Sequence, residues 1–162
     1  MLTLKDYYQG RDLQFAPELT REIQANAAET LHRVNLLLLD FYRANPRAAI
    51  RSVNSGWRPV AVNRGVQNAA QRSHHLTAKA CDLSDDDGNL DRWLLTNAGQ
   101  SSLVRIELWM EDPTATPRWC HVQIVAPKSG RRVFLPGGQW SVVGGRLAAA
   151  AASPRERRLK AD

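Results

Sequence analysis

The chain has 162 residues, of which 22 are lysine or arginine and 16 are aspartate or glutamate, so its net charge is +6 with histidine neutral. This length predicts one domain with a hydrophobic core of its own, and two cysteines exclude a secreted disulfide framework while leaving one bridge open. No apolar run approaches the roughly 18 residues of a membrane span, and the first residues lack the features of a signal peptide. We therefore expect a protein made in the cytoplasm that does not enter a membrane, and the moderate positive charge alone does not indicate specific nucleic-acid binding.

Helices are predicted from apolar spacing in chain order. Residues 1–17 form a polar and aromatic lead, and the segment from Glu18 to Ala44 follows as a long helix with one apolar face. That face consists of Ile23, Ala27, Leu31, Val34, Leu38 and Phe41. Asn45-Pro46 ends the helix because the residue before a proline is driven out of the helical region. A short helix and loop are expected at 60–72, and a further helix is expected at 90–103 after an acidic turn.

Strands are expected at five places, namely 49–54, 79–83, 105–110, 119–125 and 131–135. The third and fourth would form a hairpin around a proline-marked turn. The sequence therefore predicts an α+β fold, with a small antiparallel sheet and flanking helices in one domain over residues 1–136. The remaining residues, 137–162, are rich in glycine, alanine and arginine, and we expect them to form a mobile C-terminal tail.

Two histidines and one carboxylate stand out as candidate metal ligands. His75 and Asp82 lie close together in the chain, and His121 lies on a later predicted strand. Such a set suits zinc and leaves a fourth position for water, which distinguishes a catalytic site from a structural one. The alternative is a closed Cys2His2 site that uses Cys81 and Cys120. Strand alternation argues against it, because each cysteine points away from its neighbouring ligand.

Arg58 follows the first predicted strand, in the turn Ser55-Gly56-Trp57-Arg58-Pro59. Its guanidinium could bind a carboxylate through two parallel hydrogen bonds. It could equally be a structural arginine that binds backbone carbonyls. The residue types alone leave both interpretations open.

Three motifs, which follow one another along the chain at 55–58, 73–82 and 119–123, resemble those of one enzyme family. Ser73-x-His75-x-x-Ala78-x-Ala80-x-Asp82 is similar to the Ser-x-His-x-x-Gly-x-Ala-x-Asp signature of zinc D-Ala-D-Ala carboxypeptidases and L-alanoyl-D-glutamate endopeptidases, which share the hedgehog/DD-peptidase fold. The turn at 55–58 resembles that family's Ser-Gly-Tyr-Arg turn, and His121 stands where its last ligand falls. The context of His121, Trp-x-His-x-Gln followed by Ser-Gly-x-Arg-Val-Phe, is similar to a subset encoded by bacteriophages.

The resemblance, which covers roughly residues 55–125, implies a zinc metallopeptidase acting on the stem or cross-bridge peptides of peptidoglycan. It implies that His75, Asp82 and His121 bind Zn²⁺ and that Arg58 and Ser73 bind the substrate. Without a signal peptide, such a protein would be associated with the virion, with virion proteins as further partners, or released to the cell wall.

Two positions depart from the family pattern. Ala78 replaces a glycine, which matters only if that position needs a positive φ angle. Arg118 stands where the family commonly has a glutamate general base, yet a peptidase of this kind needs a group that accepts a proton from the attacking water. Glu111 and Glu107 are the candidates for that catalytic role, and we favour Glu111 because it is nearer the turn. If neither serves, the alternative is a phage structural or binding module that keeps the fold without catalysis.

Overall fold

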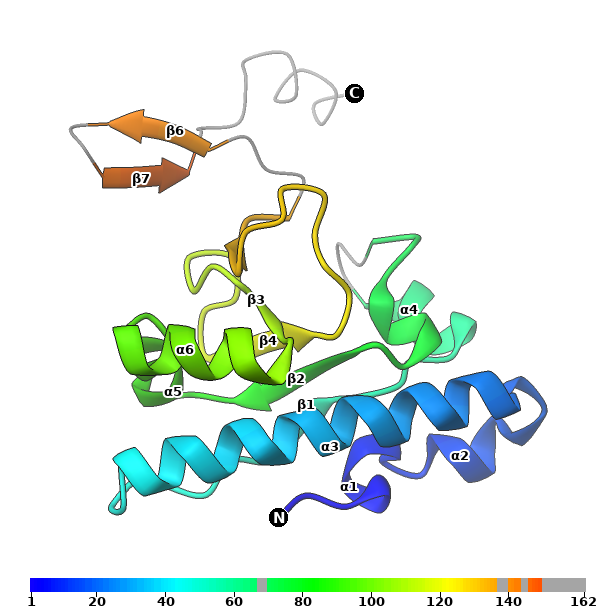
Figure 1. Ribbon diagram of the computed structural model, residues 1–162. Helices are drawn as coiled ribbons and strands as arrows, with labels where there is room; N and C mark the ends of the chain where they lie inside the picture. Colours follow the sequence, from blue (N-terminus) through cyan, green and yellow to red (C-terminus); the bar gives the residue numbers. More distant parts are fainter. Residues whose placement is uncertain (67–69, 137–139, 144–145, 150–162) are drawn as a thin grey trace.

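The computed structural model describes residues 1–66, 70–136, 140–143 and 146–149, with helices and strands that confirm the α+β class (Figure 1). The α-helices are α1 (Leu4–Tyr8), α2 (Arg11–Gln14), α3 (Arg21–Ala44), α4 (Val60–Gly65), α5 (Asn89–Leu94) and α6 (Asn97–Ile106), and two 3₁₀ helices are η1 (Ala16–Glu18) and η2 (His74–Thr77). The strands are β1 (Val53–Ser55), β2 (Ala80–Ser84), β3 (Trp109–Glu111), β4 (Trp119–Gln123), β5 (Val133–Phe134), β6 (Trp140–Val143) and β7 (Arg146–Ala149).

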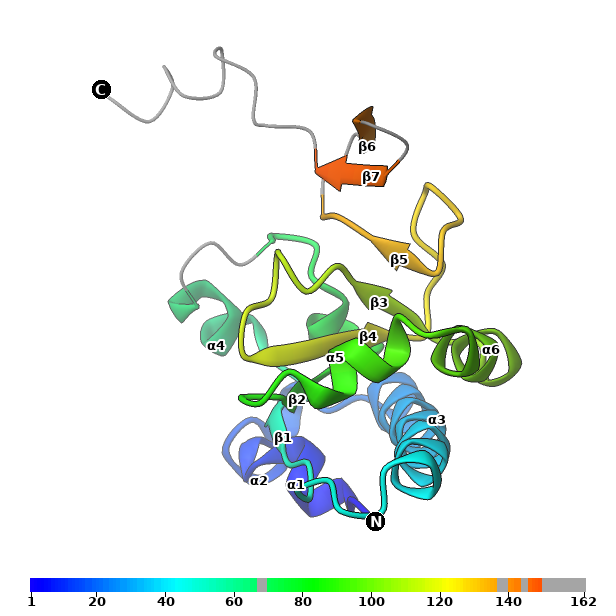
Figure 2. The ribbon, with the colours of Figure 1, turned by 90° about the vertical axis from the view of Figure 1, so that its left-hand side faces the viewer.

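Five strands form one mixed sheet in the order β1-β2-β4-β3-β5. Neighbouring pairs are antiparallel from β1 to β3, which confirms the hairpin of β3 and β4. The last pair, β3 and β5, is parallel, so the prediction of a purely antiparallel sheet was wrong there. The reason is the path of the chain. After β4 it turns back and passes to the far side of β3, where it must run in the direction of β3 (Figure 2).

The long helix α3 begins and ends close to the predicted places. The Thr20 hydroxyl accepts a hydrogen bond from the Ile23 N–H at its start, and Asn45 caps its end. Its apolar face packs into a core that also contains Cys81 and Cys120 from β2 and β4. Helices α1 and α3 lie on the same side of the sheet (Figure 2). Among the described residues, no helix is long and apolar enough to cross a membrane.

The segment between β2 and β3 differs from the prediction. The single helix expected at 90–103 is two helices, because the chain turns at Thr96 and the Thr96 hydroxyl caps α6 by accepting from the Gly99 N–H. The strand expected at 105–110 begins only at Trp109. Glu107 takes a left-handed conformation with φ 58° and ends α6. It therefore does not lie on a strand.

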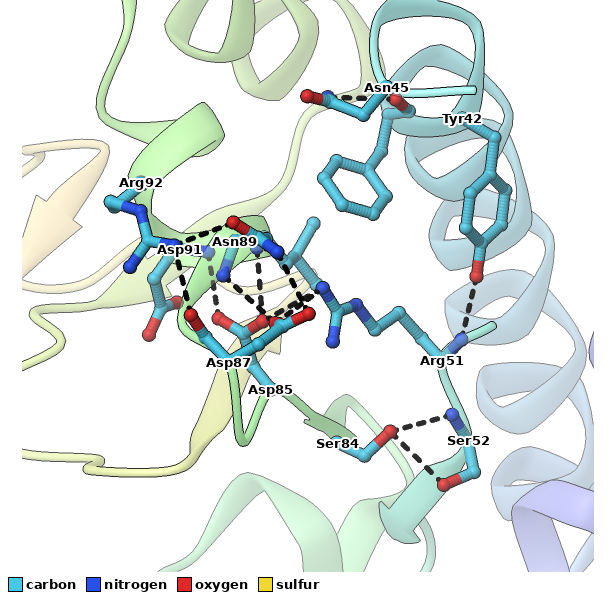
Figure 3. Close-up of polar contacts among 12 residues, drawn as sticks. Tyr42, Asn45, Arg51, Ser52, Ser84, Asp85, Asp87, Asn89, Asp91 and Arg92 are labelled. Carbon is cyan, nitrogen blue, oxygen red and sulfur yellow. Dashed lines mark hydrogen bonds and ion pairs between the residues drawn. The ribbon is translucent and has the colours of Figure 1, made fainter. Parts of the chain in front are cut away.

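A buried ionic cluster fixes the connection between β2 and α5 (Figure 3). The Arg51 side chain is 4% exposed, and its Nη2 lies 2.7 Å from Asp87 Oδ1 and 3.2 Å from Asp85 Oδ1. The Asp85 carboxylate also accepts hydrogen bonds from the N–H groups of Leu90 and Asp91 in the first turn of α5. The predicted acidic turn is thus a helix cap that is tied to the buried arginine.

Part of the segment predicted to be a mobile tail is described. There β6 and β7 pair as a separate two-stranded antiparallel sheet. Residues 137–139, 144–145 and 150–162 of that segment lie outside the described residues.

Candidate metal centre

The structure brings the three predicted ligands together. One ligand atom each from His75, Asp82 and His121 lies within 4.8 Å of the other two, so the group could hold a metal ion. Asp82 and His121 stand opposite each other in the antiparallel pair of β2 and β4. They occupy the face of the sheet opposite to Cys81 and Cys120, as alternation predicts. His75 joins them from η2, the turn that leads into β2.

The hydrogen bonds of the cluster determine which atoms face its centre. His75 Nδ1 lies 2.7 Å from the carbonyl oxygen of Gly56. Because a carbonyl can only accept, Nδ1 carries the hydrogen and His75 Nε2 carries the lone pair. Nε2 is buried and makes no hydrogen bond, although it lies 3.3 Å from Asp82 Oδ2. His121 Nδ1 lies 2.7 Å from Asp82 Oδ1. A cation at this point would satisfy the buried lone pair of His75, and so the residues fit a metal.

The electrostatics of the cluster separate its two histidines. Burial lowers the pKa of His75 despite the neighbouring Asp82 carboxylate. Burial also acts to lower the pKa of His121, but the hydrogen bond and charge of Asp82, with the charge of Glu111, raise that pKa above its ordinary value. Burial opposes ionisation of Asp82, yet the two histidines hold its pKa well below the usual range. Asp82 is therefore ionised at neutral pH, as a metal ligand must be.

Ala78 ends η2, the turn that carries His75. This residue is fully buried with φ 55°, so the position at which the family has glycine does need a left-handed conformation. An alanine there costs about 1–2 kcal/mol. The Ala78 carbonyl accepts a hydrogen bond from Thr30 Oγ1 at 2.8 Å, and the Tyr7 hydroxyl lies 3.0 Å from it and 2.7 Å from the Ala80 carbonyl. Helices α1 and α3 thus hold the turn in its strained form.

A cleft of about 520 Å³ opens beside the ligands. Its wall includes His121 and Gln123 from β4, Glu111 from β3, and Ser73 and His74 from the start of η2. Ser73 Oγ also accepts a hydrogen bond of 3.1 Å from Arg58 Nη2. The predicted substrate-binding pair is therefore in contact at the edge of the metal site.

Of the residues considered for a general base, Glu111 is the one that lines this cleft. Burial raises the pKa of Glu111 and the charge of Asp82 adds to this rise, whereas the charges of His121 and Arg58 act to lower it. Glu107 instead lies 3.3 Å from Arg33 Nη1 with its side chain 66% exposed, so the strand predicted at 105–110, which would have included Glu107, was wrong at this residue.

Arg118, at the family's usual position for the base, is directed to solvent. Its Nη2 lies 2.8 Å from Asp86 Oδ1, and both side chains are mostly exposed. The position therefore offers no proton acceptor to the cleft.

The cysteine alternative is not formed. Cys81 and Cys120 are free thiols, fully buried in the core, and burial raises the pKa of each well above its ordinary value. Neither thiol joins the group of possible ligands found among the described residues.

Sequence reasoning missed the supports of the site. Gly56, Tyr7 and Thr30 hold ligand-bearing segments through backbone carbonyls. A residue pattern carries no signal for such contacts between distant segments.

Comparison of the chain with protein-family models, curated proteins and solved structures found no match in any of the three. The resemblance to zinc peptidases therefore rests on the sequence motifs, and the candidate metal centre rests on the geometry of His75, Asp82 and His121.

Proposed function

We propose that this protein is a zinc-dependent peptidase of the hedgehog/DD-peptidase type that hydrolyses peptidoglycan peptides. The observation that carries the proposal is the convergence of His75, Asp82 and His121 beside a cleft that also contains Glu111. Three protein ligands of this kind leave a coordination position free, which catalytic zinc sites require. The motifs at 55–58 and 73–82 favour the same family.

The three ligands would hold Zn²⁺, which when bound polarises a scissile carbonyl and lowers the pKa of water. Glu111 would accept the proton of the attacking water and pass it to the leaving amine. Its position supports this role because burial raises the pKa of the carboxyl and makes it a better base than an exposed glutamate. The free carboxylate is thus supplied from β3 and not from position 118.

Arg58 and Ser73 would bind the substrate. Arg58 is half-buried, and its Nε is buried without a hydrogen-bond partner. A guanidinium with an unpaired donor beside a candidate metal site is suited to a carboxylate or a peptide carbonyl. His74 lines the same cleft, and burial lowers its pKa, so it would be neutral at pH 7 and able to share a hydrogen bond with substrate.

A second candidate function is a phage structural or binding module that keeps the fold without turnover. The observation that favours it is Arg118, which replaces the family's usual base and pairs with Asp86 at the surface. As a peptidase it would act on the cell wall, reached from the virion or after release, and as a module it would associate with other virion proteins.

Metal content and peptide release would distinguish the two candidates. We expect the purified protein to bind one zinc per chain and to release peptide fragments from peptidoglycan. His121→Ala should lose both properties. Glu111→Gln should keep the metal and lose activity by about 100-fold or more, whereas Glu107→Gln should keep both. Zinc binding without cleavage by the wild type would favour the module, and a protein that binds no metal would refute the proposal.

A further inference from the structure

The cleft carries two cations that the proposed chemistry does not use. Arg72 lies in the segment before η2, and Lys128 lies in the turn between β4 and β5. Both residues line the cleft and both are exposed to solvent.

Neither cation is neutralised by a group in the part of the chain that the structure describes. Within residues 1–66 and 70–136, no ion pair or side-chain hydrogen bond joins Arg72 or Lys128 to another group. Other arginines near the sheet are engaged. Arg51 pairs with the buried Asp85 and the exposed Asp87, and Arg132 stacks on Trp109 and donates hydrogen bonds to two backbone carbonyls. The two cleft cations are therefore available to an occupant.

The charge of the cleft lining is one-sided. Among the described residues that line it, Glu111 is acidic while Arg72 and Lys128 are basic, and Arg58 adds a further cation in contact with Ser73. The lining near Lys128 in the chain includes the polar Ser129, and the apolar lining residues are Pro127, Phe134, Leu135 and Pro136. An occupant that matches both features has an aliphatic part and more than one anionic group.

We propose that Arg72 and Lys128 select anionic peptides, so that a second free carboxylate near the bond to be cut increases binding. The proposal rests on the proposed function, because it takes the occupant of the cleft to be a peptide. One carboxylate would bind at Arg58, and the second would bind at the exposed cations Arg72 and Lys128. Because both cations are solvated, each should increase the affinity only modestly.

The test uses two synthetic stem peptides that differ only in one carboxylate, free in one and amidated in the other. Binding is measured on the full-length, zinc-loaded protein in a Glu111→Gln background, so that the peptides are not consumed. The affinity ratio of the two peptides is compared among the parent, Arg72→Gln, Lys128→Gln and the double variant. Lys5→Gln and Arg21→Gln are matched controls, because both are exposed cations outside the cleft.

We expect the acidic peptide to bind about three- to tenfold more tightly to the parent at low salt, and each cleft substitution to reduce that ratio about two- to fivefold. The double variant and high salt should remove the preference, and the controls should keep it. An unchanged ratio in the double variant, no binding of either peptide, or equally tight binding of a single-stranded oligonucleotide would overturn the inference.

Cleavage by the wild type separates this inference from the proposed function. Equal cleavage of both peptides would refute the selection by Arg72 and Lys128 and leave the peptidase standing. A binding preference that depends on these cations without any cleavage would support the selection and refute the catalysis.

Discussion

Gly56 connects α1 to the metal centre, and Gly56→Ala should damage both. The Gly56 carbonyl accepts the hydrogen bond of His75 Nδ1 at 2.7 Å. A Cβ added at Gly56 would lie 2.2 Å from the backbone oxygen of Tyr7 and 2.8 Å from two atoms of its ring. Carbon contacts settle near ~3.5 Å, so the two segments would have to separate by roughly 1 Å. Tyr7 is fully buried, so its side chain has no space for another rotamer that would relieve the clash.

We expect Gly56→Ala to lower the free energy of unfolding by about 1–3 kcal/mol, the usual cost of overpacking a core. The same displacement moves the carbonyl that orients His75, and loss of such a partner weakens metal affinity about 10–100-fold. Urea unfolding of the metal-free protein measures the first effect. Competition with a chromophoric chelator, under conditions in which the variant is folded, measures the second.

Two other glycines provide matched controls. A Cβ at Gly65 would meet no atom within 4 Å, so Gly65→Ala should change neither property by much. A Cβ at Gly99 would lie 2.2 Å from the Trp93 carbonyl oxygen, in the contact of α5 with α6, so Gly99→Ala should lose stability and keep its zinc affinity. The coupling of Gly56 to His75 would be refuted by either of two results. One is a stability of Gly56→Ala equal to that of Gly65→Ala, and the other is a zinc affinity of Gly56→Ala equal to that of Gly99→Ala.

Two further predictions concern the cluster at the start of α5. Burial raises the pKa of Asp91 to about 6, and one of its oxygens is buried without a hydrogen bond. Because this pKa lies above that of the unfolded chain, stability should fall as pH rises from about 4 through 6. Asp91→Asn should remove about 1–2 kcal/mol of that fall in urea titrations, and parallel profiles of variant and wild type would contradict the assignment. Arg51→Met should destabilise the protein by about 3–5 kcal/mol because it leaves Asp85 buried without its cation. Arg92→Met, on the exposed side of the same turn, should cost under about 1 kcal/mol, and equal losses in urea unfolding would show that burial of the pair does not matter.

The parts of the fold that could be predicted are those with a local pattern. The apolar spacing of α3 and the stop at Asn45-Pro46 both depend on residues within the helix itself. Alternation in β2 and β4 placed Cys81 and Cys120 in the core, and therefore Asp82 and His121 on the other face. Burial on one face makes such a register unambiguous, since a shift by one residue would expose both cysteines.

The features that were missed depend on contacts between distant segments. The parallel pairing of β5 follows from the route of the chain around β3, which no single strand pattern records. The N-terminal segment is helical, and Tyr7 is buried in the core. Its hydroxyl hydrogen-bonds to the carbonyls of Ala78 and Ala80, which lie more than 70 positions further along the chain. One local signal was present, since Thr3 and Asp6 have the spacing of a capping box and form one at α1.

The same division applies to the candidate site. Residue type and motif were enough to select His75, Asp82 and His121, because metal ligation is a property of these side chains. The choice between Glu111 and Glu107 needed the backbone. Four residues apart on one strand, they would share a face, but Glu107 adopts a positive φ and closes α6, so only Glu111 continues into β3 beside β4. The conformation of a single residue thus leaves one candidate base in the cleft and directs the other to solvent.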